Sequence, residues 1–130
     1  MFRTLPMMAL VIIAYNIIVY LTGLSMDTQV TTISLISGAI WTIDVGDVIV
    51  FCGLLLLFFE LVGSTQTGAS TIINHALSML VLLVALVQFI VLPEFGTSTF
   101  FALVILALFD VVAGFTVTIT AARRDFTVGE

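Results

Sequence analysis

The sequence predicts an all-α membrane protein, a four-transmembrane-helix bundle with a small outer β-hairpin or interfacial element between the first two helices. Of the 130 residues, 62% are apolar and 8% are charged, whereas soluble domains average about 45–50% and about 25%. The apolar residues form four runs close to the roughly 20 residues that a spanning helix needs. A soluble fold of this length could not bury so much apolar surface. We therefore expect the lipid bilayer to cover a single domain over residues 1–130.

The four expected spans cover residues 5–24, 47–63, 71–92 and 98–122. A signal peptide also begins with a positive residue and an apolar run, but this first run has spanning length and lacks a small-residue cleavage site. We therefore expect it to remain as a helix. The other three spans begin near residue types that cap helix N-termini. These are Asp47, Ser70, and Thr97 or Ser98.

The three cations of the chain set the expected orientation. Arg3 precedes the first span, and Arg123 and Arg124 follow the last. Because positive residues favour the cytoplasmic side of a membrane, both termini are expected in the cytoplasm. Four crossings satisfy that arrangement and place the connection 25–46 on the outer side.

The outer connection has the composition of a structured element rather than a free linker. Ser37 and Gly38 have turn chemistry and separate two β-compatible runs, VTTISLI and AIWTIDV. We expect a hairpin lying over the outer end of the bundle, with a short interfacial helix as the alternative. Trp41 is the expected interfacial anchor, because tryptophan favours the headgroup level of a bilayer.

Each span carries one narrow stripe of small or polar residues that share a face of a 3.6-residue helix. The members, span by span, are Ala9, Asn16 and Gly23; Gly46, Gly53 and Glu60; Asn74, Ser78, Val81, Ala85 and Gln88; and Ala107, Asp110, Gly114 and Ala121. Small residues let helices approach closely in lipid, so Gly53, Ala85, Ala107 and Gly114 are the expected helix-packing residues. Polar residues on a stripe need one another, because lipid offers no hydrogen-bond partner. The stripes predict a compact bundle, or faces that bind a second copy or another subunit.

Glu60, His75 and Asp110 are the ionisable residues expected inside the membrane, where each costs roughly 2.5–3.5 kcal/mol on insertion scales. With a rise of about 1.5 Å per residue, Glu60 and His75 lie near the cytoplasmic ends of two antiparallel neighbouring helices. We therefore expect a hydrogen bond between them.

Asp110 is expected near the midplane of the membrane, at a depth similar to that of Asn16. Without a positive partner it should be neutral and donate a hydrogen bond to Asn16 or to a backbone carbonyl. Gln88 lies nearer the outer side and extends this polar ladder, and Asn74 is a further intramembrane polar candidate.

The sequence contains no complete catalytic, metal or cofactor motif. Its single histidine rules out a haem site with two histidine ligands within one chain, and the expected depth of Asp110 argues against zinc bound with Glu60 and His75. Cys52 is the only cysteine, which excludes an intramolecular disulfide, and we expect it to be a small packing residue. The absence of a basic patch argues against nucleic acid. We expect no enzyme activity, no cofactor and no bound metal.

Three segments of the chain resemble small four-span inner-membrane proteins of bacteria, for which no activity is established. They are SGAIW with the following Gly46-Asp47, ELVGSTQTGASTIINHALSML, and FDVVAGFTVTITAARRDF. The resemblance covers about the last two thirds of the chain and implies a bacterial inner-membrane location. The length and number of spans are also similar to those of small multidrug transporters. Those proteins carry their key glutamate in the first span, where this chain has Asn16 instead.

Two functions are compatible with these observations. The first is a non-enzymatic accessory, scaffolding or assembly subunit of a membrane complex, in which the intramembrane polar groups hold helices in register. The second is a proton- or ion-coupled channel or transporter that uses Glu60, His75 and Asp110. A homo-oligomer or a larger membrane complex is expected in either case.

Overall fold

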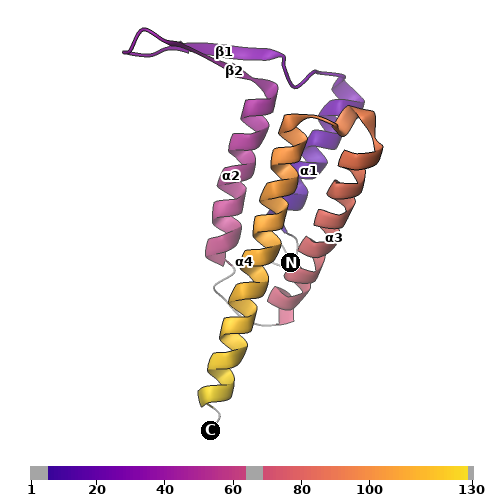
Figure 1. The fold of residues 1–130 in the computed structure, drawn as a ribbon, viewed down its shortest axis with the longest axis vertical. Coiled ribbons are helices and arrows are strands. Elements are labelled where there is room, and N and C mark those ends of the chain that lie inside the picture. Colours follow the sequence, from indigo (N-terminus) through magenta and orange to yellow (C-terminus); the bar gives the residue numbers. More distant parts are fainter. Residues whose placement is uncertain (1–5, 64–68, 129–130) are drawn as a thin grey trace.

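In the computed structural model of the chain, four helices lie side by side and a two-stranded hairpin extends from one end of the bundle (Figure 1). The structure describes residues 6–63 and 69–128. Arg3, the start of the predicted first span and the loop residues 64–68 lie outside the described residues, as do the side chains of Ala121 and Arg124. The elements in chain order are α1 (Met7–Ile17) with a π-helix (Ile18–Thr22), β1 (Gln29–Ser34), β2 (Ile40–Asp44), α2 (Val45–Gly63), α3 (Ala69–Val91), a 3₁₀ turn (Pro93–Phe95) and α4 (Ser98–Val128).

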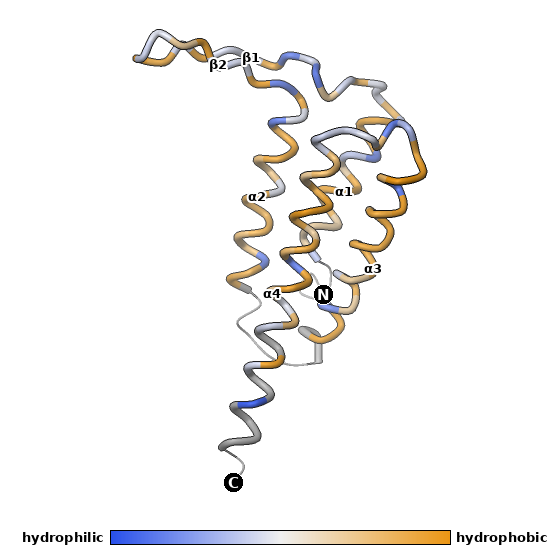
Figure 2. The backbone as a smooth tube through the Cα atoms, viewed as in Figure 1, coloured by the Kyte–Doolittle hydropathy of each residue, from blue (hydrophilic) through white to orange (hydrophobic). Residues whose placement is uncertain are grey.

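Three of the helices are long and apolar enough to cross a membrane, namely α2, α3 and α4. Figure 2 shows hydrophobic residues along most of their length within the bundle. The first helix is shorter, with 11 residues of α-helix and a five-residue π-helix. At about 1.5 Å per residue it measures about 24 Å, less than the roughly 30 Å of a hydrocarbon core. A full crossing by this segment therefore stays a prediction.

The helix boundaries correct three details of the sequence-based prediction. The second span begins at Val45, so Asp47 lies in its first turn and Asp44 precedes it. The two aspartates bond reciprocally, with Asp44 Oδ1 accepting the Asp47 N–H at 2.8 Å and Asp47 Oδ2 accepting the Asp44 N–H at 3.2 Å, as in a capping box. The third helix begins at Ala69 and so includes Ser70. The last helix continues past residue 122 to Val128 and extends beyond the other three (Figure 1).

The cap predicted for the last helix is present. Thr97 Oγ1 accepts the Phe100 N–H at 3.1 Å, which satisfies one of the backbone donors that a helix N-terminus leaves unpaired.

Helix α4 is central, since its contacts with α3 and α2 are the most extensive between any two helices, and it also contacts α1. In the apolar part of α4 that is long enough to span a membrane, 44% of the residues are buried, against 22% in the corresponding parts of α2 and α3. At the hairpin end of the bundle the core is aromatic. The Tyr15 and Phe95 rings both pack against Phe100, with centroids 4.8 and 4.9 Å away, and the Tyr15 hydroxyl lies 2.7 Å from Thr97 Oγ1. These side chains, rather than the hairpin, fill this end of the core.

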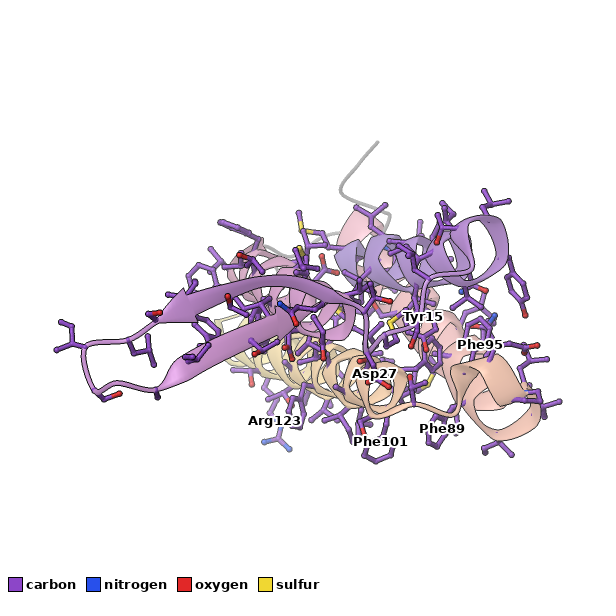
Figure 3. The ribbon with its side chains drawn as sticks, turned by 90° about the horizontal axis from the view of Figure 1, so that it is seen from above. Tyr15, Asp27, Phe89, Phe95, Phe101 and Arg123 are labelled. Carbon is purple, nitrogen blue, oxygen red and sulfur yellow. The ribbon has the colours of Figure 1, made fainter. Side chains whose placement is uncertain are left out.

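The expected hairpin is present, and the interfacial-helix alternative is wrong. Strands β1 and β2 pair antiparallel, and the turn at Leu35–Gly38 places Gly38 at a φ of 91°, which favours glycine. However, the hairpin does not lie over the bundle. It extends sideways beyond the helices, away from α3 (Figures 1 and 3). The physical reason is that β2 runs directly into α2 without a linker on which the strands could fold back.

Two further expectations differ from the structure. Cys52 is exposed on α2 and so does not pack inside the bundle. Gly23 is also exposed, and it follows the π-helix in the left-handed conformation, with φ 67°. It therefore ends the first helix rather than packing it against a neighbour.

Candidate functional site

The candidate site is a group of polar side chains in the part of the bundle remote from the hairpin, which we call the interior cluster. Its members come from three helices and are Glu60, Asn74, His75, Ser78 and Asp110. The side chains of Asn74, His75, Ser78 and Asp110 are buried. A buried polar group is costly unless it has a partner, so the contacts within the cluster decide what it can do.

Asp110 and Ser78 join the two helices that pack together most closely. Asp110 is 4% exposed. The Ser78 hydroxyl lies 3.2 Å from Asp110 Oδ2 and 3.0 Å from the backbone oxygen of Asn74, and it can donate to either. A hydroxyl carries one proton, so both bonds reach full strength only when Asp110 is itself protonated and donates to Ser78. This geometry suits a carboxyl group that holds a proton.

Glu60 links α2 to the start of α1 and to α3. Its Oε2 accepts the backbone N–H of Met7 at 3.3 Å, one of the donors that the N-terminus of α1 would otherwise leave unpaired. A side-chain hydrogen bond joins Glu60 to Asn74, whose backbone oxygen lies 3.0 Å from the Ser78 hydroxyl that contacts Asp110. Its other oxygen, Oε1, is buried and has no hydrogen-bond partner among the described residues. The two carboxyl groups therefore belong to one site.

His75 lies against the backbone of α4 at Gly114. A Cβ added to Gly114 would lie 2.7 Å from Cδ2 and 2.9 Å from Nε2 of the imidazole, closer than van der Waals contact allows. The ring of Phe115 lies 6.2 Å from that of His75. Gly114 thus forms a notch that only the absence of a side chain provides.

The hydrogen bonds of Glu60 run to Met7 and Asn74, rather than to His75 as expected. Consecutive residues on a helix point about 100° apart, so Asn74 and His75 cannot both face α2. The structure directs Asn74 toward α2 and places His75 against α4.

The depth of Asp110 in a membrane stays a prediction, whereas its level within the bundle follows from the structure. Measured from the hairpin end at about 1.5 Å per residue, Asp110 lies about 18 Å along its helix, Ser78 about 20 Å and Glu60 about 22 Å. The three side chains therefore lie at nearly the same level of the bundle, where Ser78 reaches Asp110.

Asn16, one of the two partners expected for Asp110, instead pairs with Gln88. The Gln88 amide nitrogen donates to Asn16 Oδ1 at 2.9 Å. The Asn16 amide nitrogen donates to Ile12 O at 2.8 Å and lies 3.5 Å from Gln88 Oε1. This amide pair joins α1 to α3 nearer the hairpin end than the interior cluster.

Apolar side chains pack around Gly53, which lies along α2 at a level between the amide pair and the interior cluster; we call these residues the apolar layer. Around Gly53, an added Cβ would lie 3.1 Å from Leu106, 3.3 Å from Leu103 and 3.6 Å from Val11, so three helices meet closely at this glycine. Ala107 and Ala85 are buried near this layer, at 2% and 0% exposed. Among the described residues, the two polar groups therefore do not form one continuous row.

Within residues 6–63 and 69–128, no group of three His, Cys, Asp or Glu side chains is placed to hold a metal ion.

The sequence-based prediction gave no weight to Tyr15, which lies fully buried and whose hydroxyl reaches the backbone oxygen of Glu94 at 3.3 Å. The only feature of the sequence that could have pointed to this role was the polar aromatic side chain of Tyr15 directly before Asn16.

Comparison of the chain with protein-family models, curated proteins and solved structures gave no match.

Proposed function

We propose that the protein is a small four-span integral membrane protein that acts as a non-enzymatic accessory, scaffolding or assembly subunit of a membrane complex. The observation that supports this proposal is the apolar layer at Gly53, which lies at a level between the interior cluster and the amide pair. Paired polar groups with apolar packing between them hold helices in register and offer no continuous route for an ion. The proposed location is a bacterial inner membrane with both termini in the cytoplasm, because the three arginines flank the first and last spans.

The apolar outer faces of α2 and α3 are the proposed sites of assembly. Only 22% of the spanning residues of each helix are buried, and in a complex the helices of a partner or of a second copy would replace lipid on the remaining surface. In lipid, such contacts depend on van der Waals packing and hydrogen bonds rather than on a hydrophobic drive.

A second candidate is proton-coupled transport, which the two carboxyl groups of the interior cluster favour. Glu60 Oε1 is buried without a partner among the described residues, and the bonds of Ser78 suit a protonated Asp110. Buried carboxyl groups of this kind occur in proton relays of pumps and transporters.

Proton flux in proteoliposomes distinguishes the two candidates. The assay compares the wild type with Glu60→Gln and Asp110→Asn, and uses Thr116→Val as the matched control, because the exposed Thr116 hydroxyl bonds only within its own helix, to Val112 O. We expect the wild type and all variants to match empty vesicles. Flux that Glu60→Gln or Asp110→Asn abolishes, while Thr116→Val retains it, would overturn the accessory proposal in favour of transport.

Assembly has a test of its own. Extraction of the tagged protein from native membranes in a mild detergent, followed by mass measurement, should give a particle of fixed stoichiometry that is larger than the 14.0 kDa chain with its bound detergent. A particle containing only one copy of this chain, at every detergent concentration that keeps other complexes intact, would contradict the proposal.

A further inference from the structure

The hairpin leaves the bundle at the level where α2 begins and extends sideways from the helices (Figure 1). Its position is held at its base. The Val45 N–H donates to Thr28 O and the Gly46 N–H to Met26 O, both at 2.9 Å. Because β2 continues directly into α2, the height of the hairpin relative to the span cannot vary much. If α2 crosses a membrane, the hairpin therefore lies at the membrane surface.

The register of the strands gives the hairpin two chemically different faces. Residues opposite each other in an antiparallel pair project to the same face, and the faces alternate along each strand. The pairs Ile33 with Trp41 and Thr31 with Ile43 form one face, which we call the Trp41 face. The pairs Thr32 with Thr42 and Ser34 with Ile40 form the other, which we call the Thr32 face. The Trp41 face is mostly apolar, and the Thr32 face is mostly hydroxylated.

The contact between Trp41 and Phe51 shows which face is directed toward the span. The two ring centroids lie 6.2 Å apart, and Phe51 is six residues inside α2. Both side chains are more than 40% exposed. The Trp41 face is thus continuous with the outer, exposed side of α2, the surface that lipid would cover.

The charge of the hairpin is the second observation that points to lipid. Residues 28–43 contain no charged side chain, although strands with open edges in water are commonly protected by charges. Both strands of this two-stranded sheet are edges, and a single hairpin is marginally stable in water at best. The tip residue Ile36 is fully exposed and apolar. These features fit an element that rests on an apolar surface.

We propose that the hairpin lies flat on the bilayer surface, with the Trp41 face against the phospholipid chains and the Thr32 face toward water. Lipid then covers the Trp41 face at the depth where headgroups meet acyl chains. Tryptophan is enriched at this depth, and the exposed face of α2 below it extends into the same leaflet. The hairpin would hold the start of α2 at a fixed depth.

Adjacent residues on opposite faces provide a matched test. In a Cys52→Ala background, which removes the only cysteine, Ile33→Cys and Thr32→Cys are each labelled with a small environment-sensitive fluorophore in detergent. The labelled proteins are reconstituted into phosphatidylcholine nanodiscs, one copy per disc. Quenching is then measured with aqueous iodide and with lipids that carry a nitroxide on the upper part of the acyl chain.

We expect the label at position 33 to be quenched severalfold more by the lipid nitroxide than the label at position 32, and severalfold less by iodide. The single Trp41 should show the same lipid quenching without any label. Equal iodide quenching at the two positions would overturn the proposal, since the hairpin would then stand in water. The measurement is repeated in phosphatidylcholine vesicles that hold several copies. If the label at position 33 is protected from iodide only in these vesicles, the proposal is overturned in favour of contact with a second copy of this chain. The far-ultraviolet circular dichroism of each variant reports whether the fold is intact.

Discussion

The interior cluster and the hairpin differ in where their polar groups find partners. In the cluster, side chains on α2, α3 and α4 bond to one another across helices, and the packing of the bundle holds them in place. In the hairpin, the backbone bonds are made between close neighbours in the chain, and most side chains are exposed. The comparison teaches that contacts between helices hold the cluster in place, whereas local backbone bonds alone form the hairpin.

The largest expected effect is at the notch that holds His75. Gly114→Ala would place a methyl group 2.7 Å from the imidazole, and overpacking of this kind costs about 1–3 kcal/mol. The measurement is thermal unfolding in detergent. Gly96→Ala is the control, because its added Cβ would lie 3.6 Å from the nearest atom outside its neighbours, Pro93 O. Equal melting temperatures for the two variants would contradict the tight contact, and adding His75→Ala should restore most of the loss in Gly114→Ala.

The second effect concerns the bond between Ser78 and Asp110. Ser78→Ala removes the hydroxyl beside a buried carboxyl group, and leaving such a group unpaired costs about 1–3 kcal/mol. Thr116→Val serves again as the matched loss of a hydroxyl, and a surface change of this type alters stability by about 0.5 kcal/mol or less. The melting temperatures of the two variants are compared by thermal unfolding in detergent. If both variants unfold alike, the Ser78 bond contributes nothing to the bundle.

A smaller effect is expected for the amide pair. Asn16→Leu and Gln88→Leu, separately and together, form a double-mutant cycle across α1 and α3. Interhelical hydrogen bonds in membranes couple by about 0.6 kcal/mol on average and up to about 1.7 kcal/mol. A coupling energy indistinguishable from zero would mean that the pair only satisfies its own polar atoms.

The smallest effect on the bundle should come from the hairpin. Ile33→Thr removes an exposed apolar side chain from the Trp41 face, so the unfolding of the bundle in detergent should change by less than about 0.5 kcal/mol. A destabilisation as large as that of Gly114→Ala would show that the hairpin and the bundle are one cooperative unit.

Much of the architecture could be predicted from local properties. Three spans follow from long apolar runs, since hydropathy depends on composition alone. The hairpin follows from Ser37 and Gly38 between two β-compatible runs, because its bonds connect residues close in the chain. The cap at Thr97 is equally local.

The partners inside the bundle could not be predicted with the same success. A stripe places Asn74 on an inward face, but whether Asn74 or its neighbour His75 meets Glu60 depends on the rotation of α3 by a fraction of a turn. The sequence likewise placed Asp110 beside Asn16, because depth along an isolated helix says nothing about where its neighbours begin and end. Tyr15 is far in sequence from Phe95 and Phe100, and no local pattern brings its ring against theirs.

The sequence by itself thus determined what is local: the apolar runs, the turn of the hairpin and the identity of the few polar residues among the helices. The tertiary structure alone decided the rotation and height of each helix, and with them the contacts that link Glu60 to Asp110 through Asn74 and Ser78 and the sideways course of the hairpin. The physical reason is that lipid solvates every apolar face of a helix almost equally well, so hydropathy does not decide which face turns toward its neighbours. Close packing at Gly53 and Gly114 and hydrogen bonds between helices therefore select the one arrangement.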